Sequence, residues 1–150
     1  MPGLHQVAEV DGFITSNLKT IYIEEKLISA DKPFRYYFTL AHEIGHLILH
    51  KYIYKQAPFN NIEEYREFRK NFTANQQRRI EMQANIFAGL VLIPQEHIVK
   101  DYNEALNSIS GIKIKFDRDK LNSAIAGNLH TKYCVSKEAM KIRLDIMNRY

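Results

Sequence analysis

Two histidines and a glutamate stand close together in the segment His42-Glu43-Ile44-Gly45-His46. On a helix, residues four positions apart share one face, so both imidazoles can bind one metal ion at about 2.0–2.1 Å. Glu43 is rotated by roughly 100° from His42 and lies beside the metal, where its carboxylate can take a proton from a bound water. Zinc lowers the pKa of that water toward about 7 and polarises a scissile carbonyl. The spacing therefore predicts metal-assisted hydrolysis.

The alternative interpretation of this motif is a pair of surface histidines with an exposed glutamate between them. Apolar residues occupy nearly every side of the segment: Phe38, Leu40, Ala41, Ile44, Leu47, Ile48 and Leu49. A helix that is apolar all round is usually buried. Buried His and Glu side chains need partners, and a metal ion supplies them. The surroundings therefore favour the metal site.

A catalytic zinc site needs a third protein ligand. A third histidine six residues after His46 is excluded, because Leu49 and Tyr52 stand where that pattern requires glycine and histidine. Glu81 opens a strongly apolar helical pattern, and a helix packed antiparallel to the first could bring its carboxylate to the metal. The alternative is a carboxylate that the helix dipole favours, and we prefer the ligand. Three nearer glutamates belong to a polar helix and are expected to be solvated: Glu63, Glu64 and Glu67.

Other polar residues near the motif have less specific assignments. His50 continues the i+4 series but lies roughly 12 Å along the axis from His42, which predicts a supporting or surface residue. Asn85 follows Glu81 by one turn and could orient that carboxylate, although an ordinary helix-face asparagine explains it almost as well. One of the tyrosines could stabilise a transition state, but the sequence selects none. Cys134 is expected to be a small core residue.

The first part of the chain must supply a sheet and the helix that carries the motif. Strand-forming residues and a turn signal at Asp11-Gly12 predict three short antiparallel strands between residues 4 and 26, with a second turn at Ser16-Asn17. Asp31-Lys32-Pro33 is a helix-start signal, and apolar periodicity extends that helix over residues 33–52.

The second part of the chain is expected to be mainly helical. Thr73 to Gln76 fits a capping box that opens a strong helix over residues 73–93. The expected buried face of that helix comprises Ile80, Ala84, Phe87 and Val91. Weaker patterns predict a loop over 58–61, helices over 61–72 and 94–109, a strand over 111–116, and two tail helices, the second capped by Ser136.

The composition indicates a folded protein. Of the 150 residues, 45% are hydrophobic and 25% are charged, which excludes a wholly disordered chain. The net charge of +4 is too small to predict nucleic-acid binding by itself. No run approaches the roughly 18 apolar residues of a membrane span, and the first five residues lack a secretory signal pattern. With one cysteine and no such signal, we expect a cytoplasmic protein without membrane association.

Two segments together resemble the ImmA/IrrE family of metallo-endopeptidases: Phe38–His50 (FTLAHEIGHLILH) and Glu81–Pro94 (EMQANIFAGLVLIP). The tail segment Val135–Leu144 (VSKEAMKIRL) is also similar to that family's C-terminal helical segment. The resemblance implies a gluzincin-like zinc peptidase. His42, His46 and Glu81 correspond to its metal ligands and Glu43 to its general base. Members of the family typically cut a helix-turn-helix repressor that is encoded nearby.

We therefore expect an α+β fold. A small antiparallel sheet would pack on a zincin helix core in residues 1–116, and residues 117–150 would form a helix-turn-helix-like segment that recognises the substrate. The expected function is zinc-dependent cleavage of a protein substrate, with a helix-turn-helix repressor as the partner. Manganese also fits the ligand set. The alternative is a DNA-binding regulator or toxin–antitoxin component with a structural or vestigial metal site. Glu43 argues against it, because a structural site needs no base.

Overall fold

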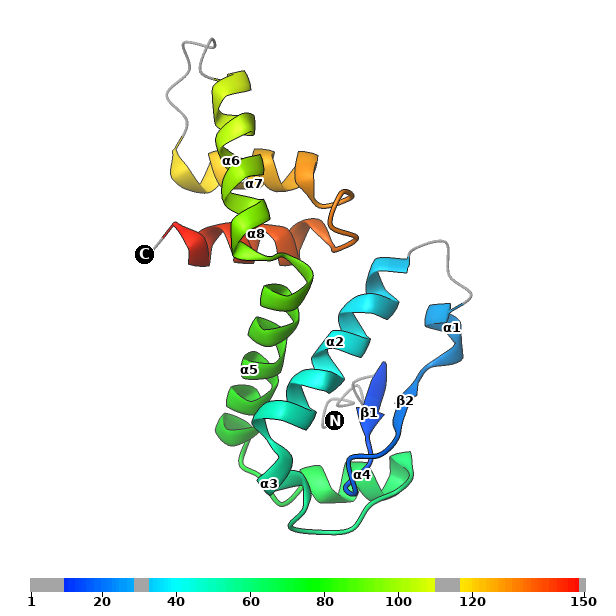
Figure 1. Cartoon of the computed structure of the whole chain (residues 1–150). Coiled ribbons are helices and arrows are strands. Elements are labelled where there is room, and N and C mark those ends of the chain that lie inside the picture. Colours follow the sequence, from blue (N-terminus) through cyan, green and yellow to red (C-terminus); the bar gives the residue numbers. More distant parts are fainter. Residues whose placement is uncertain (1–9, 29–32, 110–116, 149–150) are drawn as a thin grey trace, which may run out of the picture.

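The computed structural model describes residues 10–28, 33–109 and 117–148. Over these ranges the chain is mostly helical with a two-stranded antiparallel sheet, which confirms the α+β class (Figure 1). No helix in these ranges is long and apolar enough to cross a membrane. The elements in chain order are β1 (Gly12–Ile14), β2 (Ile21–Ile23), α1 (Glu25–Ile28), α2 (Pro33–Leu49), α3 (Lys51–Tyr54), α4 (Ile62–Arg69), α5 (Ala74–Leu92), α6 (Gln95–Ile109), α7 (Arg118–Leu129) and α8 (Lys137–Met147).

The sheet differs from the expected one in its turn. β1 and β2 pair in the register Gly12–Ile23, Phe13–Tyr22 and Ile14–Ile21, and the connection runs through the predicted Ser16-Asn17 turn. The prediction of a turn at Asp11-Gly12 is wrong, because Gly12 lies within β1. A Cβ atom on Gly12 would stand 2.8 Å from Thr39 Cγ2 and 2.9 Å from the Tyr22 carbonyl oxygen, so this glycine serves the close approach of β1 to α2.

Two further predictions for the N-terminal part can be compared with the structure. Residues 25 and 26 were expected in a strand but belong to the short helix α1. The segment before residue 10, the Asp31 helix start and the predicted strand over 111–116 lie outside the described residues.

The helices α2 and α5 form the antiparallel pair that the candidate site requires (Figure 1). They meet at Gly45, where an added Cβ would lie 3.2 Å from the Ala84 Cα, so the missing side chain sets how closely the backbones approach. The expected burial of the two helices is partly wrong. Ile48 and Leu49 on α2 and Val91 on α5 are each about half exposed, because no other described element covers that side of the pair.

The predicted helix starts and stops are mostly confirmed. Thr73 and Gln76 form the capping box of α5, and the Ser136 side chain accepts a hydrogen bond from the Ala139 amide at the start of α8. The motif helix ends at Leu49, and the turn of α3 continues it to Tyr54. The expected core position of Cys134 is wrong: this residue is exposed and has a φ of 50° in the turn between α7 and α8.

Two hydrophobic clusters hold the fold together. An aromatic cluster joins β1, α3 and α4 and the loop before α4: Phe13, Ile14, Tyr54, Phe59, Tyr65 and Phe68. A C-terminal cluster joins the α5–α6 junction to α7 and α8: Ile93, Ile98, Ile125, Ala126, Val135, Met140 and Leu144. The second cluster takes residues from both sides of the predicted domain boundary at 116/117, and that boundary stays a prediction.

An ion pair between the buried Asp101 and the exposed Lys132 ties α6 to the turn before α8 and supports a stability prediction. Asp101, only 6% exposed, accepts hydrogen bonds from Lys132 Nζ at 2.8 Å and from the Tyr133 hydroxyl at 2.7 Å. The hydrogen bond from Lys132 lowers the pKa of the Asp101 carboxyl below its ordinary 3.8. We expect Asp101→Asn to lower the free energy of unfolding at pH 7 by about 1 kcal/mol, because solvent around the exposed Lys132 reduces the usual contribution of a hydrogen bond to a charged group.

The pH dependence of that difference follows from the sign of the shift. A carboxyl with a lowered folded-state pKa stabilises the fold fully above its unfolded pKa and loses this contribution as the pH falls through the folded value. Urea unfolding of the two proteins should therefore differ most near pH 7 and converge below pH 3.8. A difference that stays constant across this range would contradict the ion pair as its cause.

Candidate metal centre

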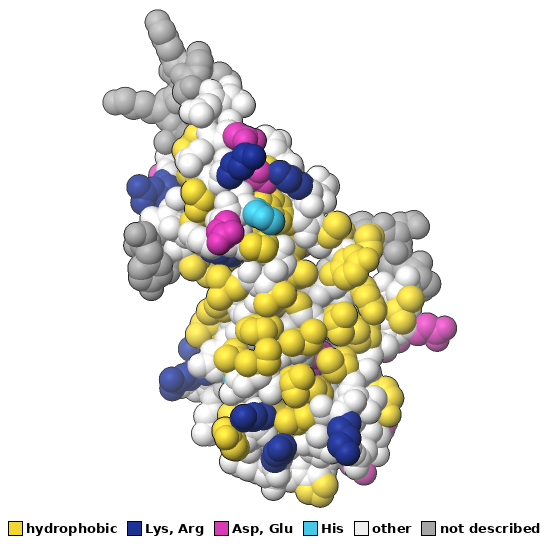
Figure 2. Space-filling view, in the orientation of Figure 1, with side chains coloured by type: hydrophobic (Ala, Val, Ile, Leu, Met, Phe, Trp, Pro, Cys, Tyr) yellow, Lys and Arg dark blue, Asp and Glu magenta, His cyan; other side chains and the backbone are white. Residues whose placement is uncertain are grey.

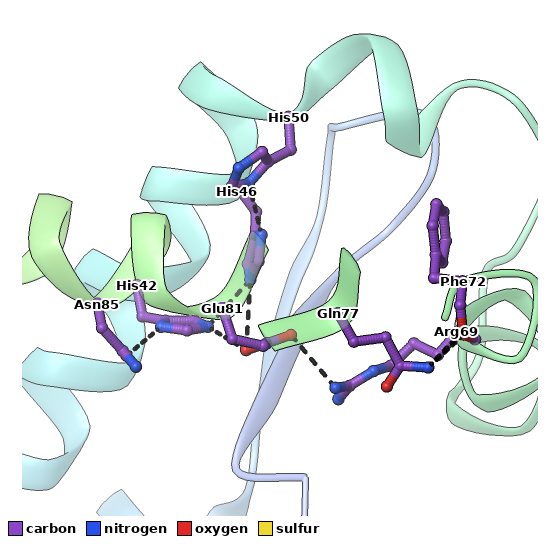
Figure 3. Close-up of polar contacts among 8 residues, drawn as sticks. All are labelled: His42, His46, His50, Arg69, Phe72, Gln77, Glu81 and Asn85. Atoms are coloured by element: carbon purple, nitrogen blue, oxygen red, sulfur yellow. Dashed lines mark hydrogen bonds and ion pairs between the residues drawn. The ribbon is translucent and has the colours of Figure 1, made fainter. Parts of the chain in front are cut away.

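Three predicted ligand atoms from two helices converge at one point. His42 and His46 lie one turn apart on α2, and Glu81 faces them from α5 (Figure 3). The Nε2 atoms of the histidines are 3.0 Å apart, and Glu81 Oε2 lies 3.2 Å from His42 Nε2 and 3.9 Å from His46 Nε2. All the potential ligand atoms lie within 4.8 Å of one another. The structure thus brings together the residues that the sequence singled out.

The hydrogen bonds behind the imidazoles determine which nitrogen is free. Asn85 Oδ1 lies 2.8 Å from His42 Nδ1 and can only accept, so Nδ1 carries the proton. His50 Nε2 likewise donates to Gln83 Oε1 at 2.9 Å, which leaves His50 Nδ1 to accept from His46 Nδ1, also at 2.9 Å. Both Nε2 atoms therefore present lone pairs toward the same space.

Such an arrangement is unfavourable without a positive charge. Two imidazole lone pairs 3.0 Å apart, with a carboxylate oxygen beside them, repel one another unless a metal ion or a proton lies between them. Burial opposes a charge on His42, but the hydrogen bond to Glu81 raises the pKa of this imidazole, so a proton occupies this space where no metal is bound. His46 is fully buried, and burial, the largest cause, lowers the pKa of its imidazole to about 3, so it stays neutral. Neutral imidazoles and an ionised carboxylate are the forms in which these side chains bind metals.

Glu43 lies beside this cluster on the side of the sheet. It is 3% exposed, and the backbone N–H of Ile14 in β1 hydrogen-bonds to its carboxylate. Its Oε2 is the buried side-chain oxygen that lacks any hydrogen-bond partner within the described part of the chain. Burial raises the pKa of the Glu43 carboxyl to about 7. A partnerless carboxylate oxygen next to a metal-binding cluster is suited to accept a proton.

A hollow of about 220 Å³ gives access to these groups. Its wall includes His42, Glu43 and Glu81, and the segment Val10–Gly12 at the start of β1 forms another side. The site therefore has an open side on which a substrate can approach, as a catalytic metal site needs and a closed structural site does not.

Sequence reasoning missed two residues of the hollow, and both come from α4. Arg69 Nη2 lies 3.4 Å from Glu81 Oε1, the carboxylate oxygen that does not face His42 (Figure 3). Tyr65 lines the hollow and is 3% exposed, and burial raises the pKa of its phenol to about 12. Tyr65 and Phe68 lie on the buried face of α4, and no sequence pattern indicated that this face reaches the motif helix.

Two neighbouring residues now have defined contacts. Asn85 orients His42 rather than Glu81, so the expected contact with the carboxylate is wrong. His50 is 3% exposed and hydrogen-bonds to His46, so it is the supporting residue and not the surface residue of the two alternatives. Glu63, Glu64 and Glu67 are exposed as expected.

Comparison with known proteins agrees with these features. A family model, Peptidase_M78, described as the IrrE N-terminal-like domain, matches residues 7–145. No curated protein and no solved structure gives a significant match. The matched range covers nearly the whole chain and includes both α2 and α5. The protein therefore belongs to the IrrE N-terminal-like family of metallopeptidases, Peptidase_M78.

Proposed function

We propose that this protein is a zinc-dependent endopeptidase in which His42, His46 and Glu81 hold the metal ion and Glu43 is the general base. The observation that carries the proposal is the convergence of two imidazole lone pairs and one carboxylate oxygen, with the ring orientations fixed by Asn85 and His50. This donor set suits Zn²⁺, and Mn²⁺ is a second candidate.

The metal, when bound, would polarise the scissile carbonyl and lower the pKa of the attacking water. The side chains of the protein would carry out the proton transfers. Among the residues that the structure describes, Glu43 Oε2 has no hydrogen-bond partner, so it could take the proton of the water and return it to the leaving amine. Gly12 of β1 packs closely against Thr39 and Glu43 on α2, which limits the space in which the Glu43 side chain can move.

Tyr65 is our candidate for stabilising the oxyanion. Tyr65 lines the hollow together with Glu43 and Glu81, which places its phenol beside the proposed reaction centre. Because the raised pKa keeps this phenol protonated at neutral pH, Tyr65 can donate to a developing negative charge.

Arg69 is proposed to position Glu81. Its guanidinium holds Oε1, so Oε2 stays turned toward the histidines. We expect Arg69→Ala to weaken zinc binding by about 10- to 100-fold, the usual effect of removing a partner of a metal ligand. Arg69→Lys should recover part of this loss, and Arg66→Ala, an exposed arginine on the same helix, should bind zinc normally. Competition with a chromophoric chelator measures all three, and unchanged affinity in Arg69→Ala would contradict the role.

The proposed substrate is a protein, specifically a helix-turn-helix repressor, as the family resemblance implies. The tail α7–α8 is proposed as the helix-turn-helix-like segment next to the zincin core. Cleavage is tested by incubating the zinc-loaded protein with the repressor encoded nearest to it and analysing the products by mass spectrometry. We expect one or a few defined cuts that EDTA prevents and zinc restores. Stoichiometric zinc without cleavage, together with salt-dependent duplex binding, would instead support the DNA-binding alternative.

A further inference from the structure

A second and larger hollow lies next to the candidate active site. This groove has a volume of about 530 Å³ and lies between α5 and α8, with Phe38 of α2 at one end. Its lining shares Phe38, Glu81 and Asn85 with the hollow over the metal ligands. The two hollows therefore adjoin at these three side chains, so a chain bound at the metal would lie next to the groove.

The groove is mainly apolar, and its walls are exposed. Met82 and Ile86 on α5 and Ile142 on α8 are 52%, 38% and 52% exposed, and all three line it. Charged side chains of both signs line the groove: Arg78 on α5 is positive, and Glu138 on α8 is negative. The groove thus offers apolar contact without a net charge.

The groove is also held in shape by a buried arginine. Arg143 of α8 is 3% exposed, and it donates from Nε to the Ile93 carbonyl oxygen at 3.2 Å and from Nη2 to Gln95 Oε1 at 2.6 Å. These bonds fix α8 against the α5–α6 junction. Binding in a preformed groove has a smaller ordering cost than binding in one that must form.

We propose that this groove binds the stretch of substrate beside the scissile bond, and that it selects at least two large, uncharged apolar side chains there. The proposal rests on the proposed peptidase function and names its substrate class. The volume falls within the range of about 300–1,000 Å³ seen for ligand pockets. This volume is larger than one side chain fills, so the preference should extend over more than one position of the substrate.

A second apolar surface, over α2 and α5, lies outside the groove. Hydrophobic side chains gather over α2 and α5 on the face shown in Figure 2, and Ile48 and Val91 are among the exposed residues of these helices. Neither residue lines the groove or the metal site. Val91 is 53% exposed and therefore offers a matched control for Ile142.

The test measures peptide binding separately from cleavage. The probe is a set of 12-residue peptides with Phe and Leu pairs and matched peptides with Ser and Thr, presented to the zinc-loaded full chain carrying Glu43→Gln. We expect the apolar peptides to bind, and Ile142→Glu to weaken this binding by about tenfold or more. Ile142→Leu and Val91→Glu should bind as the parent does. Ile142→Glu should also gain affinity for peptides with lysine in the same positions.

Three outcomes would overturn the proposal: no preference for apolar peptides, equal binding by the parent and Ile142→Glu, or equal losses in Ile142→Glu and Val91→Glu. A dimer that Ile142→Glu converts to monomer, with peptide binding unchanged, would assign the groove to a second copy and overturn it too. Cleavage by the wild-type protein is measured in parallel. Groove-dependent binding without any cleavage would refute the peptidase, whereas cleavage that ignores Ile142 would refute the groove.

Discussion

Replacing Glu43 by Gln should abolish cleavage while leaving the fold and the metal in place. The amide has the same shape and can keep the hydrogen bond from the Ile14 backbone, but it cannot accept the proton. We expect hydrolysis to fall by at least about 10²–10⁴-fold, the usual contribution of a positioned acid or base. Thermal stability should not fall, because a neutral amide is cheaper to bury than a carboxylate.

The measurement is repressor cleavage beside zinc content and thermal unfolding of the same preparation. Glu67→Gln, an exposed glutamate on α4, is the control for the substitution itself. It should keep full activity. Retained activity in Glu43→Gln would refute the mechanism, because the described hollow offers no other unpaired carboxylate beside the histidines.

The second large effect is the loss of metal from ligand variants. His46→Ala removes a fully buried imidazole, and we expect it to lose zinc and activity together. Glu81→Ala should behave in the same way, because Glu81 Oε2, which lies 3.2 Å from His42 Nε2, is the proposed third ligand atom. If each variant loses far more zinc affinity than the roughly 10–100-fold expected for a supporting residue, His46 and Glu81 are both direct ligands.

Glu63→Ala is the matched control for Glu81→Ala. It removes an exposed glutamate that lies in the first turn of α4. Glu81 lies beyond the first turn of α5, which begins at Ala74, so the helix-dipole alternative is wrong. If Glu81 were only an ordinary helix-face carboxylate, the two variants would look alike, each changing stability by about 0.5 kcal/mol or less and keeping zinc. Full zinc occupancy and normal cleavage in Glu81→Ala would therefore refute the assignment of the third ligand.

The sequence predicted the parts of the site that local spacing determines. His42 and His46 share a face because helix geometry requires it, and the capping box at Thr73 set the start of α5. Glu81 lies beside the histidines because α2 and α5 pack antiparallel. The close contact of Gly45 with Ala84 makes this packing possible. That contact is visible only in three dimensions.

The rest of the site depends on contacts between distant segments. Arg69 and Tyr65 reach the hollow because the aromatic cluster packs α4 against α3 and β1, and no local pattern records that packing. The exposed Ile48 and Val91 show a related limit: an apolar periodicity identifies a face but not whether another element covers it. The Asp11-Gly12 signal failed because the glycine was required for close approach to α2.

X-ray absorption spectroscopy of the zinc-loaded protein tests the central claim most directly, since it needs no substrate. We expect one zinc ion per chain with nitrogen and oxygen neighbours at about 2.0–2.1 Å, including two imidazoles, and no sulfur. Glu81→Ala and His46→Ala should lose this signal. A sulfur neighbour at about 2.3 Å, or an unchanged spectrum in His46→Ala, would show that the metal binds elsewhere and that these three residues are not its ligands.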